Sequence, residues 1–176
     1  VTVTDDENPM IDCSNIDGNR TTDAGVCSFT MPGVGFDPAS FSDNCPGATI
    51  TNDYNNSTSL AGETFPLGDT DVTWTVTDLA GNSITCTFTV SVVDDEDPVL
   101  DCSNINPARD ADPGVCSFTM PGTGFDPASF SDNCTGATIA NDFNGLSSLA
   151  GETFPVGSTD VVWTVTDGSG NTASCT

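Results

Sequence analysis

The fold is decided by residues 70–98, which read TDVTWTVTDLAGNSITCTFTVSVVDDEDP. Apolar residues alternate with threonines along 72–77, the period-2 pattern of a strand with one buried face. A turn at 78–82 reverses the chain, and 84–92 then alternates in the same way with Cys86 on its apolar face. Four acidic residues follow, Asp94, Asp95, Glu96 and Asp97. We therefore predict a β-hairpin at the edge of a sandwich, followed by an acidic linker to another domain.

The whole chain repeats with a period of 89 residues. The later members of the repeat, Cys102, Cys116, Cys134, Cys175 and Trp163, each lie 89 positions after Cys13, Cys27, Cys45, Cys86 and Trp74. This period is longer than that of helical solenoids and suits tandem β-domains. We divide the chain into residues 1–8, the end of a preceding repeat's last strand with an acidic linker, residues 9–94, repeat 1, and residues 95–176, repeat 2 with an incomplete last strand.

The chain begins and ends within the same predicted strand. Residues 1–4 align with 90–93, and repeat 2 stops at Thr176, where repeat 1 continues into Phe88. An incomplete last strand leaves an unpaired edge. We therefore expect residues 1–4 to pair with a sandwich other than repeat 1, either in a continuous covalent array, which we favour, or by strand donation between separate subunits.

Charge excludes several classes of function. The chain has 26 acidic residues against two basic ones, Arg20 and Arg109, for a formal charge of −24. Such a surface repels phosphate backbones and anionic lipid, so we expect no nucleic-acid partner.

No apolar run approaches the ~20 residues of a membrane span, so we expect no direct membrane insertion. Histidine and lysine are both absent, which removes the common general base, the Schiff-base amine and the Ser–His relay. We therefore expect no enzyme.

The eight cysteines indicate an oxidising compartment. They occur with no histidine and no C-x-x-C pair, and their wide spacing does not favour tetrahedral zinc. Disulfides in a chain of this size are typical of secreted proteins. We therefore predict an extracellular or cell-surface location.

Outside the hairpin, repeat 1 is predicted to hold short strands at 11–13, 27–31, 48–54 and 63–68. The insert 32–45, PGVGFDPASFSDNC, recurs almost unchanged in repeat 2. We expect its Phe36 and Phe41 to pack back onto the sandwich, since a loop this long needs apolar anchors. Six or seven short strands without helical periodicity predict an all-β, antiparallel sandwich.

These motifs resemble the hyalin repeat (HYR) domain. The matching positions are Pro9, Cys13, Cys27, Asp43 to Cys45, 64–68, 72–78, Gly81, Asn82 and 86–94, with the same set in the second copy as far as Cys175. The resemblance implies two tandem immunoglobulin-like antiparallel β-sandwiches. It also implies tandem arrays on extracellular, adhesive proteins, without catalysis.

Four cysteines per repeat allow three pairings. In an immunoglobulin-like sandwich the first strand can lie parallel beside the last, and the cysteines of these two strands both face inward. The inner two cysteines stand at the two ends of the insert, and the family pattern agrees because its outer cysteines occur without the inner ones. We favour Cys13–Cys86, Cys27–Cys45, Cys102–Cys175 and Cys116–Cys134.

The acidic linker is a candidate calcium site. In such a sandwich it arrives beside the SDNC loop and the TDxxGN turn. The predicted ligands are Asp94, Asp95, Glu96, Asp97, Asp132 and Asp167 at the junction, and Asp5, Asp6, Glu7, Asp43 and Asp78 in repeat 1. Clustered carboxylate and amide oxygens suit a hard cation such as Ca²⁺. The alternative is an ordinary solvated linker.

The remaining expectations concern surface and role. Candidate N-glycosylation sequons occur at Asn19, Asn55, Asn56 and Asn133. We predict a structural, adhesive repeat protein, a building block of a filament or adhesin stalk, whose partners are neighbouring copies of itself, end to end. The alternative is a glycan- or ligand-binding module that uses the insert 33–44 and its copy.

Overall fold

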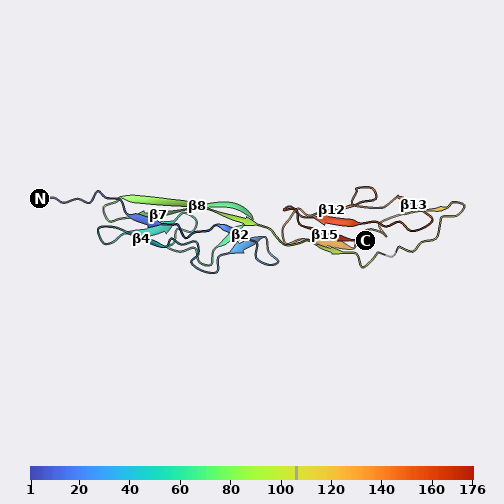
Figure 1. Cartoon of the computed structure of the whole chain (residues 1–176), viewed down its shortest axis with the longest axis horizontal. Helices are drawn as coiled ribbons and strands as arrows, with labels where there is room; N and C mark the ends of the chain where they lie inside the picture. The colour runs from blue at the N-terminus through green and yellow to red at the C-terminus, as the bar shows by residue number, and fades with distance from the viewer. Residues whose placement is uncertain (106) are drawn as a thin grey trace. The chain divides into compact units, whose positions relative to one another are not determined.

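The computed structural model describes residues 1–105 and 107–176. The chain forms two compact units, unit 1 (Val1–Asp94) and unit 2 (Asp95–Thr176), which are described separately below. Every regular element among the described residues is a β-strand, and nearly all pairs are antiparallel, so the all-β prediction is confirmed (Figure 1). No helix in the described part of the chain is long and apolar enough to cross a bilayer.

The strands of unit 1 are β1 (Met10–Asp12), β2 (Asn19–Thr21), β3 (Ser28–Thr30), β4 (Ser40–Ser42), β5 (Thr49–Asn52), β6 (Thr64–Pro66), β7 (Gly68–Thr77) and β8 (Ser83–Val93). Those of unit 2 are β9 (Val99–Asp101), β10 (Ser117–Thr119), β11 (Ser129–Ser131), β12 (Thr138–Asn141), β13 (Thr153–Pro155), β14 (Trp163–Thr166) and β15 (Thr172–Cys175).

The predicted hairpin, β7 with β8, forms the middle of a four-stranded sheet in the order β2-β8-β7-β5. Its register runs from Thr77↔Ser83 at the turn to Gly68↔Val92 at the far end. The expectation that the hairpin lies at a sandwich edge is wrong only at one end of β8, because β2 pairs with Ser91–Val93 and with no other residue of that strand, whereas β5 pairs with Trp74–Thr77 of β7. The apolar phase was predicted correctly, since Val72, Trp74 and Val76 are all fully buried.

The strand that runs parallel beside β8 is β2, not β1. It lies in the turn-rich stretch for which no strand was predicted, since its three residues have no apolar alternation. The preceding Gly18 allows a close approach, because its carbonyl accepts a hydrogen bond from the Ser91 N–H at 3.0 Å. A Cβ at position 18 would lie 1.8 Å from the Thr89 carbonyl oxygen.

The first strand, β1, instead pairs antiparallel with β4 from the insert, with Ile11 opposite Phe41. Of the two predicted anchors, Phe36 is fully buried, whereas Phe41 remains 41% exposed on this two-stranded ribbon. The insert therefore anchors through Phe36. Asp37 holds it further, since its carboxylate accepts from Ser59 Oγ at 2.7 Å and from the Leu60 N–H at 2.8 Å.

Unit 2 repeats this plan with a smaller hairpin. Pairs β9–β11 and β10–β13 reproduce β1–β4 and β3–β6. In the three-stranded sheet β12-β14-β15, however, β14 begins only at Trp163 and β15 ends at Cys175. Two aromatic residues that unit 1 buries completely, Phe36 and Phe65, have half-buried counterparts in unit 2, Phe125 and Phe154.

Candidate metal site and disulfide frame

Asp78 organises the turn of the β7–β8 hairpin. Its Oδ1 accepts hydrogen bonds from the N–H groups of Gly81 at 2.6 Å and Asn82 at 2.8 Å, and its Oδ2 accepts from Asn82 Nδ2 at 2.7 Å. Burial raises the pKa of Asp78, but the hydrogen bonds from Asn82, Gly81 and Ala80 outweigh it and leave the pKa below its ordinary value. Asp167 repeats this arrangement in unit 2.

The N-terminal acidic segment meets this turn, as the sequence predicted. Asn82 Nδ2 also donates to the backbone carbonyl of Asp5 at 3.3 Å. Asp5, Asp43 and Cys45 each offer a ligand atom, and these atoms lie within 4.8 Å of one another. The structure thus brings two of the predicted carboxylates together beside the hairpin turn, whereas the predicted ligands Asp6 and Glu7 are exposed.

The carboxylate of Asp43 has one engaged and one unengaged oxygen. Its Oδ2 accepts from the Cys45 N–H at 3.0 Å, while its Oδ1 is buried and has no hydrogen-bond partner among the described residues. The same holds for Asp132, whose Oδ2 accepts from the Cys134 N–H at 3.0 Å and whose Oδ1 is buried without a partner in that part of the chain. A buried carboxylate oxygen without a partner is costly, and a bound cation would satisfy it.

Cys45 is a free, exposed thiol next to these carboxylates. Its pKa is raised, first by the hydrogen bond to Asp5 and then by burial and the negative charges of Asp5, Asp43 and Asp78. The sulfur is therefore held in its neutral form, which is a poor ligand for a hard cation. Any ion at this site would be held by oxygens.

The other predicted ligands lie at or beyond the end of β8. Asp94 is buried, and its Oδ1 accepts from Thr22 Oγ1 at 3.3 Å. Asp95 and Asp97 are exposed, and Glu96 is half-buried. Calcium coordination by these residues remains a prediction.

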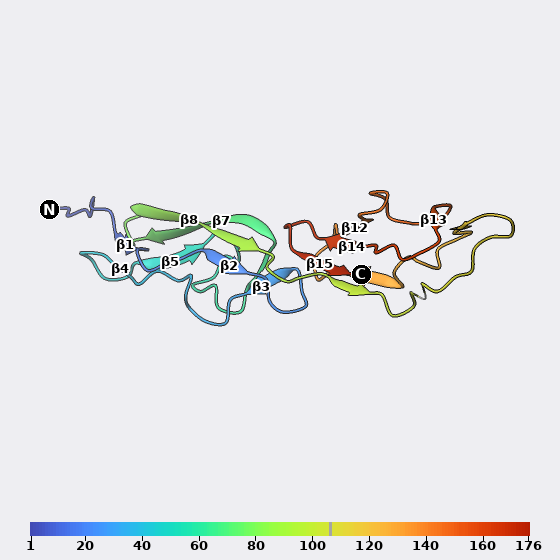
Figure 2. The same cartoon turned by 45° about the vertical axis from the view of Figure 1, so that its right-hand side comes forward.

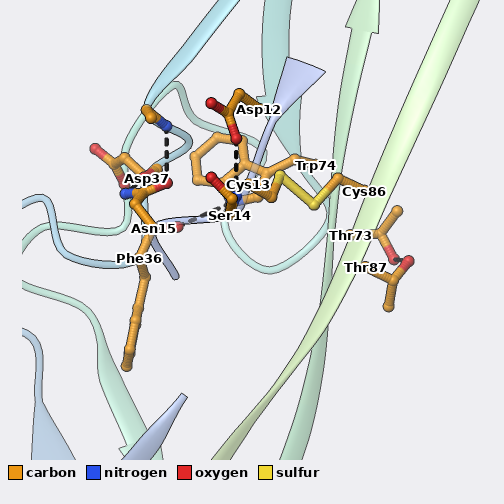
Figure 3. Close-up of a disulfide and its surroundings, with 11 residues drawn as sticks. Asp12, Cys13, Ser14, Asn15, Phe36, Asp37, Thr73, Trp74, Cys86 and Thr87 are labelled. Carbon is orange, nitrogen blue, oxygen red and sulfur yellow. Dashed lines mark hydrogen bonds between the residues drawn. A yellow bond between two sulfur atoms is a disulfide. The ribbon is translucent and has the colours of Figure 1, made fainter. Parts of the chain in front are cut away.

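The outer cysteines form the predicted disulfides. Cys13 is bonded to Cys86, and Cys102 to Cys175, each pair with Cα atoms 6.7 Å apart. Figure 3 shows the first bridge beside Trp74, which lies opposite Cys86 in the hairpin register. The Trp74 indole N–H donates to the Phe36 carbonyl at 3.0 Å, so bridge, indole and insert form one packed layer.

The predicted inner pairs, Cys27–Cys45 and Cys116–Cys134, are wrong, because Cys45 and Cys116 are free thiols. In unit 1, Cys27 precedes β3 near the end of β8, where the Thr22 N–H donates to the Val93 carbonyl.

Cys45, by contrast, lies beside Asp5, near the start of β8. The eleven residues of β8 separate these two ends by on the order of 35 Å. A disulfide needs Cα atoms within about 7 Å. Figure 2 shows β4 and β3 towards opposite ends of unit 1.

The candidate glycosylation sites differ in their surroundings. Asn19 and Asn56 are exposed, and Asn133 is half-buried. The Asn55 side-chain amide donates to the Ser59 carbonyl and to Glu63 Oε1, both at 3.0 Å. A glycan on Asn55 would disturb these bonds, and one on Asn19 would disturb the bond from its Nδ2 to Asp17 Oδ1 at 2.9 Å, so Asn56 suits modification better. Glycosylation itself remains a prediction.

One cavity was not predicted as a binding site. Unit 2 contains a cavity of about 610 Å³, lined among others by Arg109, Phe125 and Trp163.

Comparison with known proteins identifies two consecutive matches to one family model, the HYR domain, over residues 4–92 and 93–176. Hyalin from Strongylocentrotus purpuratus is 30% identical over 178 residues, covering 96% of this chain and 13% of that protein. Hyalin from Lytechinus variegatus is 37% identical over 121 residues, covering 65% of this chain and 21% of that protein.

A third relative is the mouse protein named sushi, von Willebrand factor type A, EGF and pentraxin domain-containing protein 1. It is 38% identical over 112 residues, which cover 63% of this chain and 3% of that protein. The chain therefore spans only a small part of each of these relatives.

Proposed function

Because the chain belongs to the HYR domain family and consists of two consecutive copies of that domain, we propose that it is a structural, adhesive building block of an extracellular filament or adhesin stalk. Its proposed partners are neighbouring copies of the same protein, and its proposed role is non-enzymatic. The disulfides support a secreted or cell-surface location, since such bonds persist in oxidising compartments.

The observation that carries the proposal is the position of the outer disulfide. The Cys13–Cys86 bridge joins residues 73 positions apart, near the two ends of unit 1, and Cys102–Cys175 does the same in unit 2. Tension applied along the chain therefore passes through a covalent bridge, and the enclosed residues cannot be extended. This arrangement suits a load-bearing spacer.

Single-molecule stretching tests this function directly. With the bridge intact, unfolding unit 1 should release only the residues outside it. After reduction, or in the double variant Cys13→Ser/Cys86→Ser, the extension should grow by on the order of 250 Å, the length of 73 extended residues. Cys45→Ser, which removes a free thiol, is the matched control and should leave the extension unchanged. Equal extensions with and without the bridge would contradict the proposal.

We also propose that calcium stiffens this spacer. The support is the approach of Asp5 to Asp43 and the buried, unengaged Oδ1 of Asp43. These two carboxylates would hold the ion, and the 89-residue period places the same residue types at Asp94 and Asp132. Asp78 would contribute less, since both of its oxygens already accept hydrogen bonds in the turn.

Chelation tests the calcium proposal. An ion that binds only the folded state stabilises it by mass action, so adding Ca²⁺ should raise the melting temperature and a chelator should reverse the rise. The variant Asp43→Asn/Asp132→Asn should respond much less. Asp53→Asn should respond like the parent, because this exposed side chain bonds the Thr73 N–H in the middle of β7. A melting temperature that does not change with Ca²⁺ would refute the proposal.

A glycan-binding surface is the second candidate, and one observation favours it. Phe41 and Phe130, on equivalent strands of the two inserts, are 41% and 40% exposed and could stack on sugar rings. Phe36 is fully buried and is not available for such contact. Glycan-array binding that disappears in Phe41→Ala/Phe130→Ala would support this function, and an array without signal would leave the structural role.

A further inference from the structure

The outer disulfide of unit 1 separates a loaded part of the chain from an enclosed part. Cys13 and Cys86 are joined across 73 positions of the sequence. When the chain is pulled from both sides of the unit, tension crosses from Cys13 to Cys86 through the two sulfur atoms. Residues 14–85 form a closed covalent loop beside this path, so they carry no tension while the bond is intact.

The pulling direction follows β8. Asn82, just before this strand, donates to the Asp5 carbonyl at 3.3 Å, so the chain reaches the sandwich near the start of β8. It leaves at Asp94, directly after the last residue of β8. Entry and exit therefore lie at opposite ends of this strand (Figure 1), and tension acts along its length.

The loaded half of β8 has almost no further length to release. Residues 87–93 follow Cys86 in the same strand and reach the exit. A β-strand rises about 3.3 Å per residue, and a fully extended chain spans at most about 3.3–3.6 Å per residue. On the entry side β1 is a strand as well. Detaching either segment from its neighbours would therefore gain very little length under tension.

Most of the hydrophobic core belongs to the enclosed part. Three of the largest fully buried side chains, Trp74, Phe36 and Phe65, lie between the two bridged cysteines in the sequence. The loaded half of β8 adds Val90 and Val92, with exposures of 0% and 1%. The sandwich is thus assembled mainly from residues that lie beside the load path.

We propose that the Cys13–Cys86 bond and the second half of β8 carry the tension through unit 1, while the enclosed sandwich stays folded under load. The inference rests on the proposed load-bearing role and names its load path and its redox control. Surfaces on residues 14–85, among them the exposed Phe41 of β4, then remain formed in a stretched filament.

Reduction of the bridge changes the load path. A dithiol such as dithiothreitol cleaves the sulfur–sulfur bond and is itself oxidised to a cyclic disulfide, while its two hydrogen atoms convert Cys13 and Cys86 to thiols. Tension then runs through all the residues between them and acts on the hydrogen bonds and core contacts of the sandwich. The oxidised unit resists extension independently of its folding stability, whereas the reduced unit unfolds at a force that depends on it.

Insertions of ten Gly/Ser residues test the load path in single-molecule stretching of the 176-residue chain. The background is a variant with only the outer cysteines, in which serine replaces Cys27, Cys45, Cys116 and Cys134. Near-UV circular dichroism checks that each variant folds.

The first insertion lies between Gly33 and Val34, inside the enclosed loop. It should leave the stretched length of the oxidised chain unchanged and lengthen the reduced chain by on the order of 35 Å. The same insertion between Asp95 and Glu96, outside both bridges, is the matched control and should lengthen both chains by that amount. Val34 and Asp95 are exposed, and a Cβ on Gly33 would meet nothing within 4 Å, so both places accommodate added residues.

Gly18→Ala tests the independence from folding stability in the parent chain. Gly18 lies in the enclosed part, and an added Cβ would lie 1.8 Å from the Thr89 carbonyl oxygen. The reduced variant should unfold at a lower force than the reduced parent, whereas the two oxidised force–extension curves should superimpose. Gly33→Ala, whose added Cβ meets nothing within 4 Å, should follow the parent in both states.

Two results would overturn the inference. One is an unfolding step in the oxidised chain that moves to lower force in Gly18→Ala, since the enclosed sandwich would then bear load. The other is an oxidised chain that becomes longer with the insertion after Gly33. The first result would leave the proposed function standing, because the bridge would still limit the extension. Equal extension of the oxidised and reduced parent chains would contradict the proposed function itself.

Discussion

At the scale of single residues, the hairpin turn depends on one carboxylate. Asp78 gathers the N–H groups of Gly81 and Asn82 and the amide of Asn82, and so closes the chain between two long strands. Gly81, which lies in this turn, has a φ of 96°, a value that favours glycine. The motif is therefore a folding device, and its repetition at Asp167 gives both units the same turn.

This turn should make stability depend on pH. The folded pKa of Asp78 is lowered, so its contribution is complete above the unfolded value of 3.8 and is lost as the pH falls through the folded value. Urea unfolding of the parent chain should therefore show stability falling below pH 3.8.

Asp78→Asn should be less stable at pH 7 and should lose less on acidification. The control Asp95→Asn changes an exposed linker residue and should follow the parent curve. Equal acid sensitivity of Asp78→Asn and the parent would contradict this account of the turn.

At the scale of elements, the close approach of the chain at Gly18 to Thr89 decides that β2 pairs with β8 of the hairpin. β2 reaches β8 because Gly18 has no side chain where the Thr89 carbonyl passes. Gly18→Ala would place a Cβ 1.8 Å from that oxygen and should destabilise unit 1 by about 1–3 kcal/mol. Gly33→Ala is the matched control, because an added Cβ at position 33 meets nothing within 4 Å. Denaturant unfolding measures both, and equal stabilities would rule out the close approach.

The Cys13–Cys86 disulfide should contribute more to the stability of unit 1 than the close approach at Gly18 does. Removal of a native disulfide costs about 2–5 kcal/mol in small secreted domains. We expect this loss for Cys13→Ser/Cys86→Ser in calorimetry, and almost no change for Cys45→Ser, whose thiol is free. A comparable loss in both variants would show that the bridge is not what stabilises unit 1.

The strands with long alternation were predicted correctly from the sequence, whereas the pairing of short strands and cysteines far apart in the chain was not. The ten and eleven residues of β7 and β8 have a clear period, so phase, turn and outer disulfide were predicted. β1, β2 and β4 have three residues each, and their partners follow from packing rather than from pattern. The inner cysteine pairs failed for a related reason, since alternation indicates which face a cysteine occupies and not which end of the unit.

At the scale of the whole molecule, composition and repetition carried the most information. The 89-residue period gave the two-unit organisation, and the absence of lysine and histidine removed most catalytic chemistry. The approach of Asp5 to Asp43 was also foreseen, because the linker and the two loops meet at one end of such a unit.

The central claim is that these units are load-bearing links of an extracellular filament or stalk. Negative-stain electron microscopy of the native material, labelled with an antibody against residues 1–176, tests it most directly. We predict label along extended filaments or stalks outside the cell. Label confined to dispersed, compact particles, or to the cell interior, would contradict the account.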